Sequence, residues 1–321
     1  MTNFSKTSLP PKEDGPQYDI YNNTWTSNNN SSSDRSQLYF YAHQVIYIFM
    51  LCICIIGLEG NRTVISLLGF HIKRSFFTTY ILNLAVADFG VLVFGTLYCI
   101  FGLAPQCFSD LFSIVNISAT FFCVASQLLL TAISVDRCVC VLFPIWHRCH
   151  RPPHLSITVC ALMWVLACFP SGSHVILYNL KHFRTGFDFL FYQFIVNAAL
   201  CLPLITASSL ILLFKVFGKS QQPQKGKILT IVLLAVLFFL IFVFPLDAIY
   251  TIHYFSNFKY FYLIQYGYLC AFLNSFVNPV IYYIVGRKKR GQRWESIKDT
   301  LKRAFKEEEG HEEELGTTAQ M

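Results

Sequence analysis

The stretch "SVDRCVCVLFPIWHRCHRP", residues 134–152, ends a long apolar run with the adjacent Asp136 and Arg137 and then becomes basic. The run belongs to an apolar stretch, residues 111–143, that can cross about 30 Å of hydrocarbon as a helix. Charged side chains are costly inside lipid, so we expect the pair to lie where lipid gives way to water. The stretch therefore predicts a membrane-spanning helix that ends in an ion pair.

The composition of the whole chain also indicates that lipid is its main solvent. Of the 321 residues, 54% are hydrophobic and only 13% are charged, which is too little polar surface for a soluble globule. Lipid offers no partners to backbone N–H and C=O groups, and no stretch alternates as a barrel strand would, so each span should be a helix. We predict an all-α membrane protein with a bundle of seven transmembrane helices: 40–69, 76–104, 111–143, 155–178, 187–217, 227–255 and 260–285.

Lys and Arg side chains gather in alternate loops of this bundle. Because cytoplasmic loops carry an excess of these residues, we expect a multi-pass protein of the plasma membrane with its N-terminus outside and its C-terminus in the cytoplasm. The basic loops are 71–74, 147–152, 219–227 and 286–293. Four N-x-Ser/Thr sequons agree with a glycosylated extracellular tail and begin at Asn3, Asn22, Asn29 and Asn30.

Four parts of the chain follow from these assignments. Residues 1–39 form a disordered, glycosylated extracellular tail, and residues 40–285 form the seven-helix domain. Residues 286–306 place apolar and basic side chains on opposite helical faces, which predicts a short amphipathic helix on the inner membrane surface. Residues 307–321 are acidic and are expected to form a disordered cytoplasmic tail.

No residue pattern points to catalysis or to a disulfide. The chain has no HExxH, GxSxG, Walker-type loop or CxxC in a suitable context, so we expect no enzyme and no nucleic-acid partner. Most of its 12 cysteines lie in the apolar stretches, where they are expected to pack as small apolar residues. Cys107 is the best extracellular candidate for a bridge, but the loop at 179–186 offers no partner, and we predict no disulfide.

Ionisable residues inside the spans are candidates for function. Glu59 and Arg62, three residues apart, are expected to neutralise each other. Asp88 has no adjacent cation, and other spans offer neutral polar groups at comparable depth: Asn61, Ser126, Asn274, Ser275 and Asn278. Such a cluster suits a small hard cation such as Na⁺, and it equally suits a water network or a structural network that shares a proton.

Proline interrupts four of the spans, at Pro170, Pro203, Pro245 and Pro279. Proline removes a backbone hydrogen bond and kinks the helix, and such kinks create cavities and hinges. We expect a ligand pocket near the outer ends of these helices, lined by His174, Tyr178, Asp188, Asp247, Tyr250, His253 and Tyr254. A buried Asp247 carboxylate would favour a cationic ligand, although a hydrogen bond to a neighbouring Tyr or His explains it as well.

The ordered motifs resemble one known class of receptor. They are Asn61 in "GN", Asp88 in "LAVAD", Asp136-Arg137-Cys138, Trp164, Pro203, Pro245 and "NPVIYY" at 278–283. Together they resemble the rhodopsin-like class of G-protein-coupled receptors along residues 40–305. The segments "LLTAISVDRCVCVLFPIWHRCHRP", "ILNLAVADF" and "NPVIYYIVG" are similar to the Mas-related family within that class.

This resemblance implies roles for residues already singled out. Arg137 would be held by Asp136 at rest and released on activation to meet the G protein, while Asn278, Pro279 and Tyr282 would serve the movement of the seventh helix. The sodium pocket of the class would be formed by Asn61, Asp88, Ser126, Asn274, Ser275 and Asn278.

The resemblance also implies the partners of the chain. It predicts a receptor that binds an extracellular peptide or small molecule, a cationic one included, with an allosteric sodium ion as its one candidate cofactor. Its expected partners are a heterotrimeric G protein of the Gq or Gi class, arrestin and the lipid bilayer. The alternative is a membrane transporter or a non-signalling scaffold of similar topology.

Overall fold

The computed structural model describes residues 30–72, 74–104, 109–179, 197–217, 230–231, 233–242 and 261–286 of the chain. The chain divides into two compact units, Met1–Val45 and Ile46–Met321. The described part of the first unit is helical.

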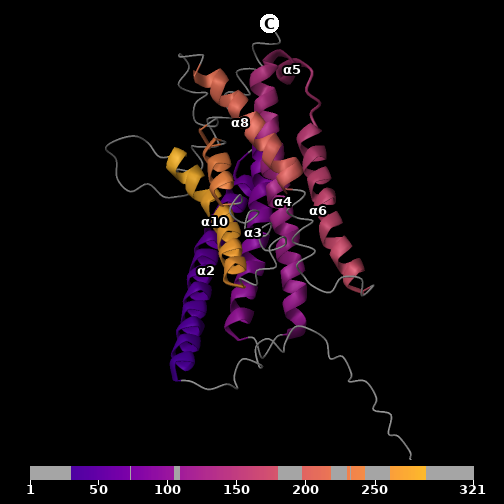
Figure 1. Ribbon diagram of the computed structural model, residues 1–321. Coiled ribbons are helices and arrows are strands. Elements are labelled where there is room, and N and C mark those ends of the chain that lie inside the picture. The colour runs from indigo at the N-terminus through magenta and orange to yellow at the C-terminus, as the bar shows by residue number, and fades with distance from the viewer. Residues whose placement is uncertain are drawn as a thin grey trace, which may run out of the picture. The chain divides into compact units, whose positions relative to one another are not determined.

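The regular structure in the described residues is helical throughout, which confirms the predicted all-α class. The helices are α2 (Asn30–Phe70), α3 (Phe76–Leu103), α4 (Ser109–Leu142), α5 (Pro144–Cys149), α6 (Leu155–Asn179), the π-helical turn η1 (Asn197–Cys201), α8 (Leu202–Phe217) and α10 (Phe261–Gly286) (Figure 1). Residues 233–242 form a further apolar helical segment.

Five of the described helices are long and apolar enough to cross a membrane. The apolar segments 199–212 and 233–242 are shorter and lie within the predicted spans 187–217 and 227–255, of which the structure describes only parts. α3, α6 and α10 lie close to their predicted bounds, whereas α2 begins at Asn30, inside the predicted tail of residues 1–39.

Local sequence explains several helix boundaries. Ser75 caps α3: its hydroxyl accepts a hydrogen bond from the Thr78 N–H, and the Thr78 side chain accepts one from the Ser75 N–H, so two otherwise unsatisfied donors are paired. Pro144 starts α5, where its missing N–H costs nothing. The π-helical turn η1 precedes Pro203, because the proline ring would crowd the carbonyl four residues earlier in a regular α-helix.

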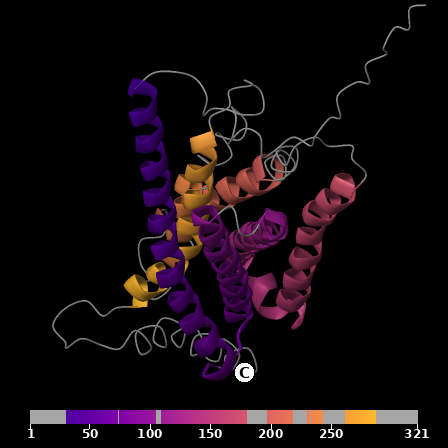
Figure 2. The ribbon, with the colours of Figure 1, turned by 90° about the horizontal axis from the view of Figure 1, so that it is seen from below.

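α4 is the centre of the packing in this unit. It packs against α3, α6 and α8, and α3 also contacts α10 and α6. In both ribbon views α6 lies on the side of α4 away from α2 (Figures 1 and 2).

Two apolar clusters fill the space between the helices. One contains Leu67, Tyr80, Leu84, Leu129 and Tyr282, near the end of α4 that carries Asp136, and the other contains Met50, Leu92, Tyr98, Val115 and Phe272. On α3, Ala87 belongs to the first cluster and Val91 to the second, so Asp88 lies where the two clusters meet. This position keeps water away from its carboxylate.

Candidate functional site

Asp136 is the centre of a buried ion-pair network at the end of α4. One carboxylate oxygen, Oδ1, lies 2.8 Å from Nη2 of Arg151, and the other, Oδ2, lies 3.4 Å from Nη2 of Arg137. The side chains of Asp136, Arg137 and Arg151 are 10%, 12% and 1% exposed. One carboxylate is therefore shared by two guanidinium groups, and the three side chains carry a net positive charge.

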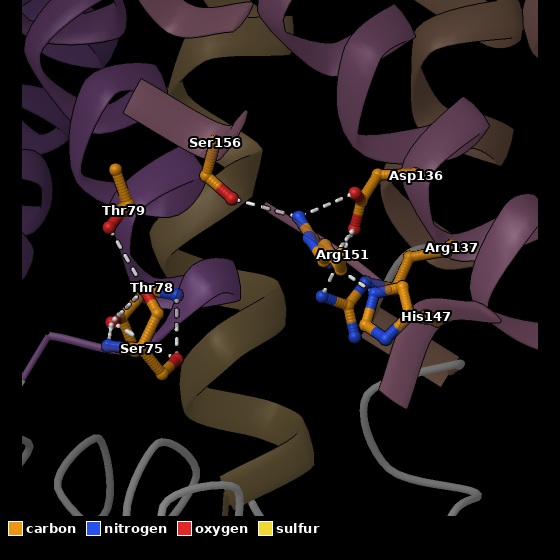
Figure 3. A network of polar contacts seen from close by, with 8 residues as sticks. All are labelled: Ser75, Thr78, Thr79, Asp136, Arg137, His147, Arg151 and Ser156. Carbon is orange, nitrogen blue, oxygen red and sulfur yellow. Dashed lines mark hydrogen bonds and ion pairs between the residues drawn. The ribbon is translucent and has the colours of Figure 1, made fainter. Parts of the chain in front are cut away.

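Arg151 links this network to the next two helices. It lies between α5 and α6, donates a hydrogen bond of 2.8 Å to the Ser156 hydroxyl on α6, and contacts His147 Nε2 on α5. Figure 3 shows its guanidinium group between Asp136 and Ser156, with His147 and Arg137 beside it. Buried guanidinium groups are stable only when their donors are paired, so these contacts fix the α5–α6 connection against α4.

The first two residues of α3 cover the two arginines with aromatic rings. Arg137 lies 4.4 Å from the centre of the Phe77 ring, and Arg151 lies 4.6 Å from the centre of the Phe76 ring. A guanidinium group over an aromatic face gains a cation–π attraction, which grows when water is excluded. The capping box at Ser75 holds this end of α3, and with it both rings.

The resemblance assigned only Arg137 to Asp136, and the structure adds Arg151 at the shorter distance. Little in the sequence singles out Arg151, because it is one of several basic residues in the segment 147–154. The orientation of the chain in the membrane already explains the positive charge of that segment. The one available signal was chemical. A carboxylate at the edge of lipid needs more than one donor, and Arg151 is the basic residue that directly precedes the rigid Pro152-Pro153 pair.

His147 is the titratable member of the network that lies outside the spans. Burial, and then the Arg151 guanidinium, hold the pKa of the His147 imidazole below its ordinary value; Arg137 acts in the same direction and Asp136 opposes it. Because Nε2 faces an arginine donor, the neutral imidazole accepts there and carries its proton on Nδ1. If Nε2 were protonated, its N–H would face an N–H of the Arg151 guanidinium group, and the two donors would repel each other.

The Asp88 cluster is the second polar site and lies deep between the helices. Asp88 is fully buried, and Oδ1 accepts a 2.6 Å hydrogen bond from the Ser126 hydroxyl while Oδ2 accepts a 2.7 Å bond from Asn278 Nδ2. Asn61 Nδ2 donates to the carbonyl oxygens of Gly57 and Ser275, at 3.1 Å each. These bonds connect α2, α3, α4 and α10.

Not every predicted member takes part in this cluster in the same way. Asn274 is buried on α10, but its side chain forms no hydrogen bond to another described residue of the cluster. Ser275 takes part through its carbonyl oxygen and also through its side chain, which interacts with Asp88. Pro279 lies inside α10 against Gly60, where an added Cβ would be 3.0 Å from Pro279 Cβ, and Tyr282 is buried one turn further along. A side chain at position 60 would therefore make Pro279 shift by a few tenths of an ångström.

The polar groups around Asp88 fit a small hard cation. The Asp88 carboxylate oxygens accept hydrogen bonds from the hydroxyl of Ser126 and the amide of Asn278, and Asn61 Oδ1 is buried and accepts no hydrogen bond from a described residue. Carboxylate, hydroxyl and amide oxygens are the ligands that such cations prefer. Elsewhere in the described ranges, no group of three or more His, Cys, Asp or Glu side chains could hold a metal ion.

An aromatic cluster that includes a polar contact lies at the opposite ends of α3 and α4 from Asp136. The Tyr268 hydroxyl on α10 donates a 2.6 Å hydrogen bond to Asn116 Oδ1 on α4, and the rings of Tyr268 and Tyr98 lie 4.5 Å apart. Phe112 and Tyr47 also pack on Tyr98, at 5.5 and 5.9 Å between ring centres. The sequence did not single out Tyr98 or Tyr268, because aromatic residues make up 17% of the chain.

Most residues of the predicted ligand pocket lie outside the part of the chain that the structure describes. His174 and Tyr178 belong to α6, but the description does not include their side chains. Outside the described residues lie Asp188, Asp247, Tyr250, His253 and Tyr254. Of the glycosylation candidates, Asn3, Asn22 and Asn29 also lie outside, and Asn30 is the first residue of α2. The eleven described cysteines form no disulfide with one another, and Cys107 lies outside the described residues.

Residues 60–282 match the family described as "7 transmembrane receptor (rhodopsin family)". The chain is 33% identical to the Proto-oncogene Mas of Mus musculus over 283 residues, which cover 82% of this chain and 84% of that protein. It is 36% identical to the Mas-related G-protein coupled receptor member D of Macaca fascicularis over 277 residues, or 79% and 83% of the two chains. The Mas-related G-protein coupled receptor member H of Rattus norvegicus is 33% identical over 292 residues, or 88% and 91%.

Proposed function

Because the chain belongs to the rhodopsin family of seven-transmembrane receptors and to its Mas and Mas-related group, we propose that it carries a signal from an extracellular ligand to a heterotrimeric G protein. The family is one of receptors and not of enzymes, and its fold is the seven-helix bundle. The proposed ligand is a peptide or a small molecule, a singly cationic one included. The proposed G protein is of the Gq or Gi class, with arrestin as a further partner.

The single observation that carries this proposal is the presence of two polar sites at opposite ends of α3 and α4. The Tyr268–Asn116 bond lies at one end and the Asp136 network at the other. The Asp88 cluster connects four helices between them. A ligand at the Tyr268–Asn116 end that binds one arrangement of α3, α4 and α10 more tightly than another would favour that arrangement. It would thereby change the fraction of molecules in which the Asp136 network at the far end is intact.

Tyr98, Asn116 and Tyr268 are the described residues that we propose to contact the ligand. A tyrosine pair offers aromatic faces, which attract a cation, and the Tyr268 hydroxyl and the Asn116 amide offer hydrogen bonds. The predicted residues His174, Tyr178, Asp188, Asp247, Tyr250, His253 and Tyr254 would extend the same pocket.

At the other end, the proposed resting state is the network around Asp136. Asp136 holds Arg137 beside Phe77, where the guanidinium group is unavailable to a partner. Release of Arg137 would expose a cation at the surface formed by α4 and α5. Asn278, Pro279 and Tyr282 lie on α10, where the missing N–H of Pro279 weakens the helix and would permit the required movement.

The Asp88 cluster would hold an allosteric sodium ion. Asp88 and Ser126 would supply a carboxylate and a hydroxyl oxygen, with Asn61, Asn274, Ser275 and Asn278 as neighbouring polar groups. When bound, the ion would neutralise the buried carboxylate. The residues themselves hold α2, α3, α4 and α10 in one arrangement through the hydrogen bonds described above.

The basic loops support the proposed orientation. Residues 71–74 and 147–152 flank the Asp136 network, so this end would face the cytoplasm of a cell whose plasma membrane holds the protein. Residues 1–39 would then form the extracellular tail, glycosylated at one or more of Asn3, Asn22, Asn29 and Asn30. Residues 40–285 would form the receptor domain, 286–306 the amphipathic helix, and 307–321 the cytoplasmic tail.

Measurement of calcium and cAMP responses tests this function. Cells that express the chain would be exposed to a panel of peptides and amines, and the most potent compound would be tested on Tyr268→Phe and Arg137→Ala. We expect Tyr268→Phe to reduce potency and Arg137→Ala to abolish the response while the compound still binds, with both variants at the cell surface. A chain with no response and no basal signal above untransfected cells would contradict the proposal.

A further inference from the structure

Glu59 and Arg62 form an ion pair on the outer face of a membrane-spanning helix. Arg62 Nη1 lies 3.2 Å from Glu59 Oε1, and the side chains of Arg62 and Glu59 are 72% and 70% exposed. Both belong to the apolar stretch Tyr41–Phe70, which is long enough to cross the membrane. Asn61 and Val64, on the opposite face of the helix, are fully buried. The pair therefore points away from the bundle.

The exposed residues around this pair follow the repeat of a single helical face. Positions three or four apart lie above one another on a helix, so a face that continues over several turns is a continuous surface. On α2 the exposed members of this face are Cys52, Ile55, Ile56, Glu59, Arg62 and Ser66. The surface is apolar except for Ser66 and one acid–base pair.

The depth of the pair makes lipid a poor neighbour for it. Glu59 and Arg62 precede Phe70, the last residue of the apolar stretch, by eleven and eight positions, or about 16 and 12 Å along the helix axis. Long charged side chains escape to water from the ends of a span, but not from its middle. Charged residues inside membranes are usually paired within protein, and here the bundle supplies no further partner from the described residues to either side chain.

We propose that this face of α2 binds a second copy of the chain, with Glu59 of each copy beside Arg62 of the other. Two copies in one membrane have the same orientation, so a two-fold axis along the membrane normal places equal residues at equal depth. The acid and the base are three residues apart, or about 4.5 Å in height, which a glutamate and an arginine span easily. The two pairs would then form one ring of four alternating charges.

Charge complementarity favours a second copy over an unrelated membrane protein as the occupant. An unrelated helix would need an acid and a base at these two depths and in this order. A second copy has them by symmetry, because the surface is complementary to itself. In the dimer each guanidinium group would face two carboxylates instead of one, and the apolar residues on either side would exclude lipid from the ring.

The same face carries a cysteine through which contact between two copies can be detected by cross-linking. Cys52 is exposed and free, and it precedes Glu59 by seven positions on the same face. In a symmetric pair the two Cys52 thiols would approach each other near the axis. Cys168, exposed and free on α6, lies on another helix and provides the matched control.

Charge exchange between two co-expressed variants tests the proposal. Glu59→Arg places four cations at the contact and Arg62→Glu places four anions. For each variant expressed alone, the amount of dimer should therefore fall at least about tenfold below that of the wild type. Dimer would be measured on full-length receptor in cells, by a short bismaleimide that cross-links Cys52 and by energy transfer between tagged copies. Cys52→Ser should remove the cross-link and Cys168→Ser should not.

The mixed pair is decisive. Co-expression of Glu59→Arg with Arg62→Glu restores opposite charges only between copies, and we expect the cross-link to return to about the wild-type level. The double variant Glu59→Arg/Arg62→Glu should also dimerise. If the mixed pair stays monomeric while both chains reach the surface, the ion pair acts within one helix and the proposal is wrong. For a single variant that fails to reach the surface, Glu59→Gln and Arg62→Gln remove one charge each and should still reduce the dimer.

Discussion

Asp136 binds Arg151, fifteen positions away, more closely than it binds Arg137, its neighbour in the chain: the distances are 2.8 and 3.4 Å. Arg151 is also the more deeply buried of the two, at 1% against 12% exposed. The carboxylate that pairs with Arg137 is therefore already neutralised in part by a second cation. In the proposed switch, this sharing would set how easily Arg137 is released.

Replacement of Arg151 by methionine is expected to lower basal signalling. Arg151→Met keeps an unbranched stem over Phe76 and removes the charge that competes with Arg137 for Asp136. If the repulsion removed is worth about 1 kcal/mol, the released state becomes about fivefold less populated. Basal nucleotide exchange on the G protein, per receptor at the surface, measures this change.

The matched control is Arg74→Met, which removes an exposed basic residue just before α3 without touching Asp136. It should leave basal exchange unchanged. A rise in basal exchange in Arg151→Met would show that Arg151 orients Asp136 rather than competing for it. Asp136→Asn, which removes the shared carboxylate, should raise basal exchange in either case.

Acid should favour the released state through His147. Its pKa is lowered in the network, whereas an imidazole free of these neighbours has a pKa of about 6.5. His147 therefore binds a proton more tightly in the released state than in the resting network. The resting network is fully favoured above about pH 6.5, and it loses stability as the pH falls from that value toward the lower pKa that His147 has in the network. The charges that face His147 are Arg151, Arg137 and Asp136.

Membranes that contain receptor and G protein permit this measurement between about pH 7.5 and 5.5. Basal exchange should rise on acidification in the wild type and in His150→Gln, whose side chain is exposed. In His147→Gln the receptor-dependent rise should disappear. An equal rise in all three proteins would assign the effect to another group.

The buried carboxylate of Asp88 should make basal activity sensitive to sodium. If Na⁺ binds at Asp88 in the resting arrangement, replacement of K⁺ by Na⁺ at constant ionic strength should lower basal exchange in the wild type. Asp88→Asn should abolish this difference because it removes the charge, and Ser126→Ala should reduce it because it removes one oxygen. An unchanged difference in Asp88→Asn would reject the sodium site and favour a purely structural network.

The sequence predicted those features that lipid makes conspicuous. A span must be apolar and helical, so α3, predicted at 76–104, is found at Phe76–Leu103. Asp88 could be selected from the sequence because a carboxylate is rare in such a span. The sequence could not predict the interactions of residues that resemble their surroundings. Arg151 is one basic residue in a basic loop, and Tyr98 is one aromatic residue among many, so only the fold shows which of them meet a partner.

The bond between Trp164 and Asn83 provides a test of packing between α6 and α3. Trp164 Nε1 donates a 3.0 Å hydrogen bond to Asn83 Oδ1, while Asn83 Nδ2 donates 2.9 Å to the Thr79 carbonyl. Trp164→Phe keeps an aromatic ring near Phe121 but leaves the Asn83 oxygen without this donor, which should cost about 1 kcal/mol. The Tm of receptor purified in detergent should then fall by roughly 2–4 °C.

Trp146→Phe, at an exposed tryptophan on α5, is the matched control and should leave the Tm unchanged. The double variant Asn83→Ala/Trp164→Phe should lower the Tm by less than the sum of the decreases in the two single variants, because each substitution removes the same hydrogen bond. If the two decreases are fully additive, the bond does not form.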